Sequence, residues 1–309
     1  MTNKHLLFIH IPKTAGTSFR IAAKDYFGDE DTFFDYGKGV TETSKEINEF
    51  VYEKEDMYEL SKEFQKHKQL FLSGHMHVTK YMHIFETLNV ITFVRNPVEQ
   101  VVSHYKHYKR DLDYKEDLET FVKDKKFQNI QSRILKGKPL ALYGFIGLTE
   151  EYEKSIELIN SYFKTDIKVL KENVSNEKSS IVVKVNEKMK QLIKEENLED
   201  MRMYKRAKVI FTERVKCFKE NRSYTHLIIQ NRTDEMIQGM AFKRESDKPV
   251  EIELYLEDKT FVCLKANFFK QGPYHHGLPR KGYIGFEYKF KSIDESKYLL
   301  KVNSKLDRV

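Results

Sequence analysis

The sequence predicts an α/β region followed by a smaller all-β module. In roughly the first 220 residues, short apolar runs such as Leu6–Ile11, Leu70–Leu72 and Asn89–Val94 alternate with stretches of helical spacing. Such alternation is typical of parallel strands joined by helices. After about Asn221, short alternating runs separated by turn-like residues take over, which indicates a sandwich or barrel. We therefore expect two domains, residues 1–221 and 222–309.

The amino-acid composition limits the kinds of binding partner and the cellular compartment that we expect. The 309 residues carry a net charge of +7, which favours anionic partners such as nucleotides or acidic glycans, although scattered surface lysines would give the same excess. Cys217 and Cys263 show neither a disulfide framework nor a metal-ligand spacing, so we expect no metal and a cytoplasmic location. No apolar run reaches about 18 residues, so no membrane span is expected.

The first strand leads into a predicted anion-binding loop. It breaks at Pro12 and is followed by Lys13, Thr14, Ala15, Gly16, Thr17 and Ser18, after which a helix begins. Gly16 allows close approach of the backbone, Lys13 supplies charge, and the first N–H groups of a helix have no partner within it. In a Walker A loop the lysine follows the second glycine, so this loop is of another kind. A plain strand–turn–helix joint capped by Thr17 is the structural alternative.

The chain up to the third strand carries a candidate base. Residues 29–39 show no period and are expected to form a loop over the site, residues 44–68 are expected to be helical, and a helix is expected over residues 79–88. His75 follows the strand that starts at Leu70. Imidazole titrates near neutral pH, so His75 could take a proton, or it could only cap a helix; His77 and, more weakly, His10 compete for the same role.

The third strand ends in a second polar motif. Arg95 follows Val94, Asn96 is expected to cap the next helix, and Pro97 to be its first residue. Ser103 lies two turns into that helix. A guanidinium forms paired hydrogen bonds with phosphate oxygens, whereas a surface ion pair and a solvent-facing serine are the simpler alternatives.

Two motifs, in this order, resemble those of sulfotransferases that use 3′-phosphoadenosine 5′-phosphosulfate (PAPS). His-Ile-Pro-Lys-Thr-Ala-Gly-Thr-Ser at 10–18 resembles the family's 5′-phosphosulfate loop, and Val-Arg-Asn-Pro-Val-Glu-Gln-Val-Val-Ser-His-Tyr at 94–105 its 3′-phosphate motif. The nearest likeness is to the branch of heparan sulfate 2-O-sulfotransferase and bacterial carbohydrate sulfotransferases. The resemblance covers about residues 4–218 and implies a three-layer α/β domain with a central parallel sheet and a P-loop-like phosphate loop, similar to nucleotide kinases.

The resemblance also implies roles for the candidate residues. His75 matches the catalytic base, and Lys13 would neutralise charge on the leaving phosphate. The 5′-phosphate would be held by Lys13, Thr14, Ala15, Gly16, Thr17 and Ser18, and the 3′-phosphate by Arg95 and Ser103. Lys171 and Ser175 match a segment that relatives fold over the nucleotide.

Further stretches of the first domain look similar to the family. Asn-Ile-Gln-Ser-Arg at 129–133 would support the acceptor or the nucleotide, or serve packing alone. Residues 143–151 are expected to form a strand that runs into a helix, with Thr149 as N-cap. A strand is expected at 167–170 and helical structure over 185–218.

The second domain is expected to be a small sandwich or barrel. Its strands are predicted at 225–229, 237–242, 250–256, 260–266, 283–290 and 298–302. The pattern resembles a β-sandwich appended to bacterial glycan-modifying enzymes, where it could contact a glycan, form a protein interface or add stability. His275 and His276 have no third ligand at useful spacing, so no metal is predicted there.

These motifs predict a sulfotransferase that moves a sulfuryl group from PAPS to a hydroxyl and releases adenosine 3′,5′-bisphosphate (PAP), with no metal required. The expected acceptor is a carbohydrate, for example a bacterial polysaccharide precursor, with a protein tyrosine or a small metabolite as alternatives. A homo-oligomer is compatible with the family, and no nucleic-acid partner is expected. The alternative functions are a P-loop-type kinase that uses ATP and Mg²⁺, and a non-catalytic glycan-binding protein.

Overall fold

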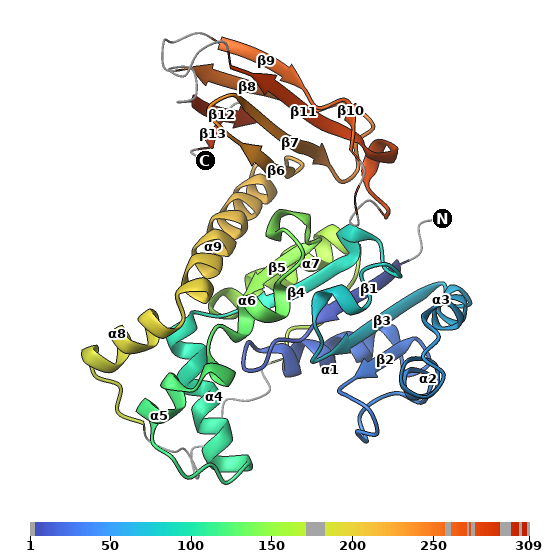
Figure 1. Ribbon diagram of the computed structural model, residues 1–309. Coiled ribbons are helices and arrows are strands. Elements are labelled where there is room, and N and C mark those ends of the chain that lie inside the picture. The colour runs from blue at the N-terminus through green and yellow to red at the C-terminus, as the bar shows by residue number, and fades with distance from the viewer. Residues whose placement is uncertain are drawn as a thin grey trace. The chain divides into compact units, whose positions relative to one another are not determined.

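The protein forms two compact units in the computed structural model, which describes residues 4–170, 183–256, 261–270, 272, 276–290, 298–302 and 305–307 (Figure 1). Unit 1 consists of Met1–Phe85 and Asn89–Thr212, and unit 2 of Glu86–Leu88 and Glu213–Val309. The chain passes from unit 1 to unit 2 within helix α9 (Leu198–Lys219). No helix among the described residues is long and apolar enough to cross a membrane.

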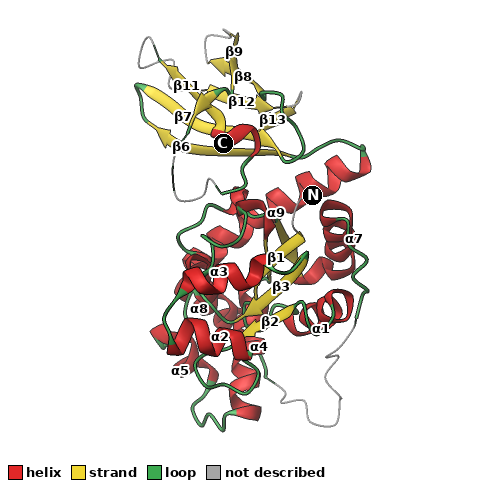
Figure 2. Ribbon diagram, turned by 90° about the vertical axis from the view of Figure 1, so that its right-hand side faces the viewer, coloured by secondary structure: helices red, strands yellow, loops and turns green. Residues whose placement is uncertain are grey.

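Unit 1 is built on a five-stranded sheet in which all strands are parallel. The order is β2 (Thr32–Asp35), β3 (Gln69–Gly74), β1 (Lys4–Ile9), β4 (Val90–Val94) and β5 (Phe145–Leu148). Strands buried on both faces are nearly continuous apolar runs, as β4 is here. Helices α1 and α7 lie on one side of the sheet and α3 on the other (Figure 2). The predicted three-layer α/β fold is therefore confirmed.

Helix ends in unit 1 follow the local sequence. The Asn96 side chain accepts a hydrogen bond from the Val98 N–H and Pro97 is the first helical residue, as predicted. A π-helical turn, Asn48–Glu53, continues α2. The helices are α1 (Gly16–Phe27), α2 (Lys45–Ile47), α3 (Met57–Gln65), α4 (Pro97–Asp111), α5 (Leu118–Lys123), α6 (Ile130–Leu135), α7 (Tyr152–Phe163) and α8 (Glu187–Glu196).

An aromatic layer fixes helix α1 on the sheet. Phe8, Phe19, Phe71 and Phe93 are fully buried. The rings of Phe8 and Phe19 meet edge to face with centroids 4.7 Å apart, and Phe93 lies 5.3 Å from Phe19. Such contacts add to the burial of large apolar area. The loop between β1 and α1 is therefore supported on both of its flanks.

Two predictions near the edge of the sheet were wrong. Residues 29–39 contain strand β2, which is only four residues long and gains its register from pairing with β3 rather than from its own pattern. Residues 79–88 hold two 3₁₀ helices, Val78–Lys80 and Thr87–Asn89, in place of an α-helix. The Lys80 and Tyr81 side chains both bind the buried Asp35 carboxylate, a tertiary contact that outweighs helical spacing.

Two further local predictions also failed. Residues 167–170 form no strand, because the Asn160 side chain bonds both the N–H and the carbonyl of Ile167, each at 2.9 Å. Thr149 does not cap helix α7; its hydroxyl donates to the Val94 carbonyl at 3.2 Å and so ties β5 to β4. The helical prediction for 185–218 is confirmed by α8 and α9.

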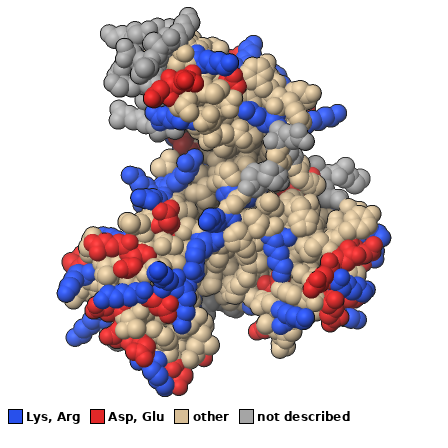
Figure 3. Space-filling model, in the orientation of Figure 1, with Lys and Arg blue, Asp and Glu red and all other residues tan. Residues whose placement is uncertain are grey.

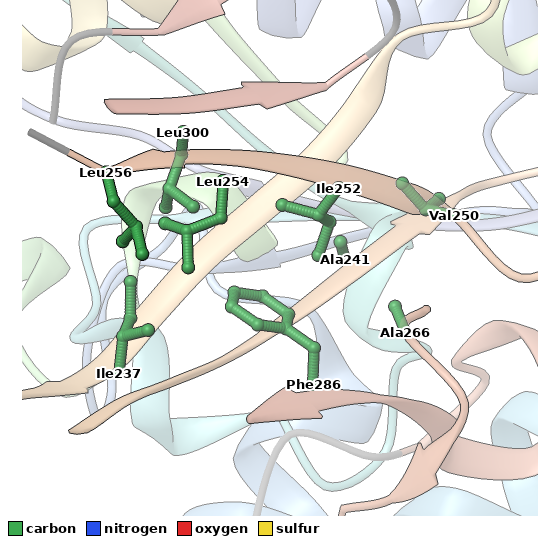
Figure 4. Close-up of a cluster of buried hydrophobic side chains, with 9 residues drawn as sticks. All are labelled: Ile237, Ala241, Val250, Ile252, Leu254, Leu256, Ala266, Phe286 and Leu300. Atoms are coloured by element: carbon green, nitrogen blue, oxygen red, sulfur yellow. The ribbon is translucent and has the colours of Figure 1, made fainter. Parts of the chain in front are cut away.

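The described residues of unit 2 form two four-stranded antiparallel sheets after the end of α9, in the orders β10–β11–β7–β6 and β13–β12–β8–β9. In β8, Ile252, Leu254 and Leu256 alternate with more exposed residues, and they meet Phe286 of β11 in a buried cluster (Figure 4). All six predicted strands are present. The strands are β6 (Thr225–Arg232), β7 (Met236–Lys243), β8 (Glu251–Leu256), β9 (Phe261–Lys265), β10 (Phe268–Phe269), β11 (Tyr283–Lys289), β12 (Tyr298–Val302) and β13 (Lys305–Asp307).

Candidate active site

The carboxyl ends of four parallel strands in unit 1 lie at the same edge of the sheet. His10 follows β1, Tyr36 follows β2, His75 follows β3 and Arg95 follows β4. Ligands of open parallel sheets bind at this edge. The structure therefore brings together three of the segments singled out in the sequence, and adds Tyr36 to them.

The loop after β1 has a strained backbone that suits an anion. Lys13 and Ala15 have φ values of 66° and 64°, in the left-handed region that costs a non-glycine residue about 1–2 kcal/mol. Backbone N–H groups in such conformations, together with a helix N-terminus, form anion-binding concavities. Helix α1 starts at Gly16 with Ala15 as its N-cap, so Thr17 is not the cap. The buried Thr14 hydroxyl donates to the Ile11 carbonyl at 2.9 Å and fixes the bend.

Gly16 is required by the His10 ring. A Cβ atom on residue 16 would lie 2.0 Å from Cδ2 and 2.4 Å from Nε2 of His10. The His10 ring is buried and stacks on Phe8 at 5.6 Å. The glycine of the loop therefore serves packing as well as any ligand, a role that the sequence alone does not reveal.

Lys13 lies among other cations. Partial burial lowers the pKa of Lys13, and the nearby charges of Arg110 and Arg95 lower it further, against Asp111, which raises it. Arg110 is itself paired with Asp111 at 2.7 Å. The positive potential at this loop thus comes from the start of α1, the end of α4 and the β4–α4 turn together.

The backbone of Arg95 is held by the Gln131 side chain. Gln131 of α6 accepts from the Arg95 N–H and donates to the Arg95 carbonyl, both at 2.9 Å, and the Gln131 side chain is fully buried. The Arg95 side chain donates weakly to the Lys13 carbonyl at 3.4 Å and lies 3.8 Å from Glu99, so its charge is only loosely paired. Gln131 of the 129–133 segment therefore fixes the Arg95 backbone.

Ser103 shares a face of α4 with a residue that the sequence analysis missed. Gln100 is buried, and its Nε2 donates to the Pro12 carbonyl at 3.1 Å, so α4 is tied to the loop. Residues three apart on a helix are neighbours, which places the half-buried Ser103 one turn along the same face. The sequence did carry a signal for this role of Gln100: a polar residue stands between Val98 and Val101, which face the interior of the protein.

His75 has the orientation of a proton acceptor. Its Nδ1 lies 2.7 Å from the carbonyl oxygen of His10. A carbonyl can only accept, so Nδ1 carries the hydrogen and the lone pair is on Nε2. Solvent reaches the ring, yet desolvation by the surrounding protein lowers the pKa of His75, against the His10 hydrogen bond, which raises it. The neutral form that can accept a proton is therefore favoured at neutral pH.

The competing histidines have other roles in the structure. His77 caps the 3₁₀ helix Val78–Lys80, with its Nδ1 2.7 Å from the Thr79 hydroxyl. His10 is buried beneath the loop, and burial lowers its pKa well below the ordinary value, with His75, Arg20 and Lys13 adding to the effect. Geometry therefore favours His75 over both.

Tyr36 and Arg20 complete this side of the site. The Tyr36 hydroxyl lies 3.1 Å from Nδ1 of His10, and the Tyr36 ring meets His75 edge to face at 4.9 Å. The Arg20 guanidinium, from α1, lies 5.2 Å from the centroid of the Tyr36 ring. Sequence analysis missed Tyr36 because the short strand before it was not recognised.

A notch marks the surface of unit 1. It lies between the part that carries α4 and α5 and the part that carries α2 and α3, and both parts carry Lys and Arg as well as Asp and Glu side chains (Figure 3). Within the described ranges, no group of three or more His, Cys, Asp or Glu side chains is arranged to hold a metal ion. Lys171 and Ser175 lie outside the described residues.

A family model identifies the first two thirds of the chain. The model of the sulfotransferase family matches residues 2–207, which include every described residue of the site. No curated protein matches the chain. The family match spans well over half of the 309 residues and ends within α9.

Proposed function

We propose that this chain, which belongs to the sulfotransferase family, takes a sulfuryl group from PAPS and passes it to a hydroxyl of a carbohydrate. The observation that carries the proposal is the meeting of three features at one sheet edge. These are the strained loop after β1, the His75 ring with its free Nε2, and Arg95 on its Gln131 support. PAP would be the second product.

The loop would hold the 5′-phosphate of the donor. Its backbone N–H groups and the start of α1 offer hydrogen bonds and positive potential to phosphate oxygens. Lys13 would neutralise the charge that develops on the oxygen that leaves sulfur, and Thr17 and Ser18 stand in the first turn of the same helix. Thr14 would act through its backbone, since its hydroxyl is bonded within the loop.

Arg95 and Ser103 would hold the 3′-phosphate. Among the described residues, the Arg95 guanidinium pairs with a carboxylate only at 3.8 Å, that of Glu99, and so can offer its paired donors to a phosphate. Ser103 lies on the face of α4 that carries the loop contact of Gln100. This pair would select PAPS over nucleotides that lack a 3′-phosphate.

His75 would act as the general base. As the acceptor oxygen attacks sulfur, its proton goes to Nε2 of His75, and the bond from sulfur to the bridging phosphate oxygen breaks with its electron pair leaving on PAP. Because Nδ1 already carries a hydrogen held by the His10 carbonyl, the two nitrogens have separate tasks.

The proposal also covers the acceptor, the cellular location and the roles of the two domains. The cationic surroundings of Lys13 and a net charge of +7 suit an acidic glycan, in line with the resemblance to carbohydrate sulfotransferases. We further propose that residues 1–221 perform the transfer in the cytoplasm and that residues 222–309 form an accessory domain. The 171–175 segment would close over the nucleotide, as the family resemblance implies.

Calorimetric titration of the full chain with PAP, 5′-AMP and ADP in the absence of Mg²⁺ tests the proposal. We expect PAP to bind at least tenfold more tightly than 5′-AMP, and Arg95→Ala to weaken PAP binding by about 10- to 100-fold, because one or two charge-assisted hydrogen bonds are lost. Arg202→Ala, on an exposed arginine paired with Glu199, is the matched control. Equal binding of PAP and 5′-AMP would refute the proposal and favour a Mg²⁺-dependent kinase.

A further inference from the structure

Two neighbouring rings cover the inner side of the His75 imidazole. The His10 ring lies 4.4 Å away at an angle of 41°, and the Tyr36 ring meets it nearly at a right angle, with centroids 4.9 Å apart. Together with the Nδ1 bond to the His10 carbonyl, these contacts fix the plane of the ring. The orientation of Nε2 therefore depends on how firmly His10 and Tyr36 are held.

Tyr36 is held from three directions. The Asp35–Gly74 pairing of β2 with β3 sets Tyr36 beside His75. The preceding Asp35 is buried and accepts hydrogen bonds from Tyr52, Lys80 and Tyr81 at 2.6–2.8 Å. On its other flank, the Tyr36 ring has the Arg20 guanidinium 5.2 Å from its centroid.

The Tyr36 hydroxyl is placed to act as a donor to His10. Burial, the largest influence, raises the pKa of Tyr36, so the phenol keeps its proton. The Tyr36 hydroxyl lies 3.1 Å from Nδ1 of His10 and can donate to it. With that donor, the neutral His10 ring carries its hydrogen on Nε2.

We propose that Tyr36 is a positioning residue for proton transfer at His75. Its ring supports the imidazole directly, and its hydroxyl anchors His10, which stacks on that imidazole. The catalytic importance of the His75 orientation rests on the proposed function. The orientation itself can be measured without turnover. The charged or titratable groups that face His75 are His10, Arg20, Tyr36, His104 and His107.

Nitrogen NMR of the ¹⁵N-histidine-labelled full chain, with and without PAP, tests this role. The His75 signals are assigned from a His75→Gln variant. Tyr36→Leu removes the aromatic ring and the hydroxyl, so more of the His75 ring is exposed to water. We expect the pKa of His75 to rise toward the ordinary value near 6.5 and the Nε2–H tautomer to appear.

Tyr36→Phe separates the two contributions. The ring remains, so His75 should keep its Nδ1–H tautomer, while the signals of His10 change because its Nδ1 has lost a donor. Tyr58→Phe is the control: it removes the hydroxyl of an exposed tyrosine in α3 and should leave both histidines unchanged.

The proposal is overturned if Tyr36→Leu retains the wild-type pKa and tautomer of His75, or if Tyr36→Phe leaves the His10 signals unchanged. The second criterion holds even if the leucine variant fails to fold. A wild-type chain that does not bind PAP would refute the proposed function instead, and the histidine signals of the free protein would still decide the role of Tyr36.

Discussion

Gly16→Ala perturbs the loop at its closest contact. The added Cβ would lie 2.0 Å from Cδ2 and 2.4 Å from Nε2 of His10, well inside van der Waals contact. The ring has little room to retreat, because it is 5% exposed, stacks on Phe8 and bonds Tyr36. The ring or the loop must therefore move.

The change in stability caused by Gly16→Ala follows from two opposing effects. Overpacking in a filled interior costs about 1–3 kcal/mol, and replacing a helical glycine by alanine returns about 0.5–1 kcal/mol. We expect the free energy of unfolding to fall by about 1–2 kcal/mol. Because the loop is the proposed phosphate site, we also expect PAP affinity to fall by about tenfold or more.

Urea denaturation and calorimetry with PAP measure the two effects. Gly28→Ala is the matched control: its φ of 86° and ψ of 162° lie in a region that costs a non-glycine residue about 1–3 kcal/mol, but its Cβ would meet no atom within 4 Å. That variant should lose stability and keep wild-type PAP affinity. The reasoning is refuted if Gly16→Ala matches the wild type in both stability and PAP affinity, or if Gly28→Ala loses as much affinity.

Two further predictions concern the supports of the site. Asp35→Asn breaks the buried pair with Lys80, and we expect a loss of about 3 kcal/mol at pH 7, the lower end for buried pairs because Lys80 is partly exposed. Burial raises the folded pKa of Asp35, but the hydrogen bonds from Lys80, Tyr52 and Tyr81 together outweigh burial and lower this pKa. The stabilisation by Asp35 is therefore present above the unfolded value near 3.9 and is lost as pH falls through the folded value. Urea denaturation should therefore show the gap to wild type narrowing below about pH 4, and a pH-independent gap would contradict this account. Gln131→Leu leaves the Arg95 N–H and carbonyl without their partner; we expect about 2 kcal/mol lower stability and weaker PAP binding than wild type, and unchanged PAP affinity would show that Arg95 does not need this support.

Much of the fold could be predicted because its signals are local. The apolar runs of β1, β3 and β4, the capping pair Asn96 and Pro97, and the alternation in unit 2 all identify elements within a few residues. Strand β2 was missed because four residues carry too little pattern, and its pairing with β3 depends on a distant segment. The predicted helix over 79–88 and the predicted strand over 167–170 were wrong. In these two segments, hydrogen bonds with the side chains of Asp35 and Asn160 determine the local structure.

The sequence by itself determined which chemical groups the protein carries and in what order: a lysine and hydroxyls before a helix, then a histidine, then an arginine, each at the end of a strand. Only the tertiary structure decided how these groups are held. Gln131 meets Arg95 across 36 residues, and His75 meets the His10 carbonyl across 65. That Nε2 of His75 is left without the ring hydrogen depends on such a long-range partner, because a hydrogen bond fixes a tautomer only when the fold brings donor and acceptor together.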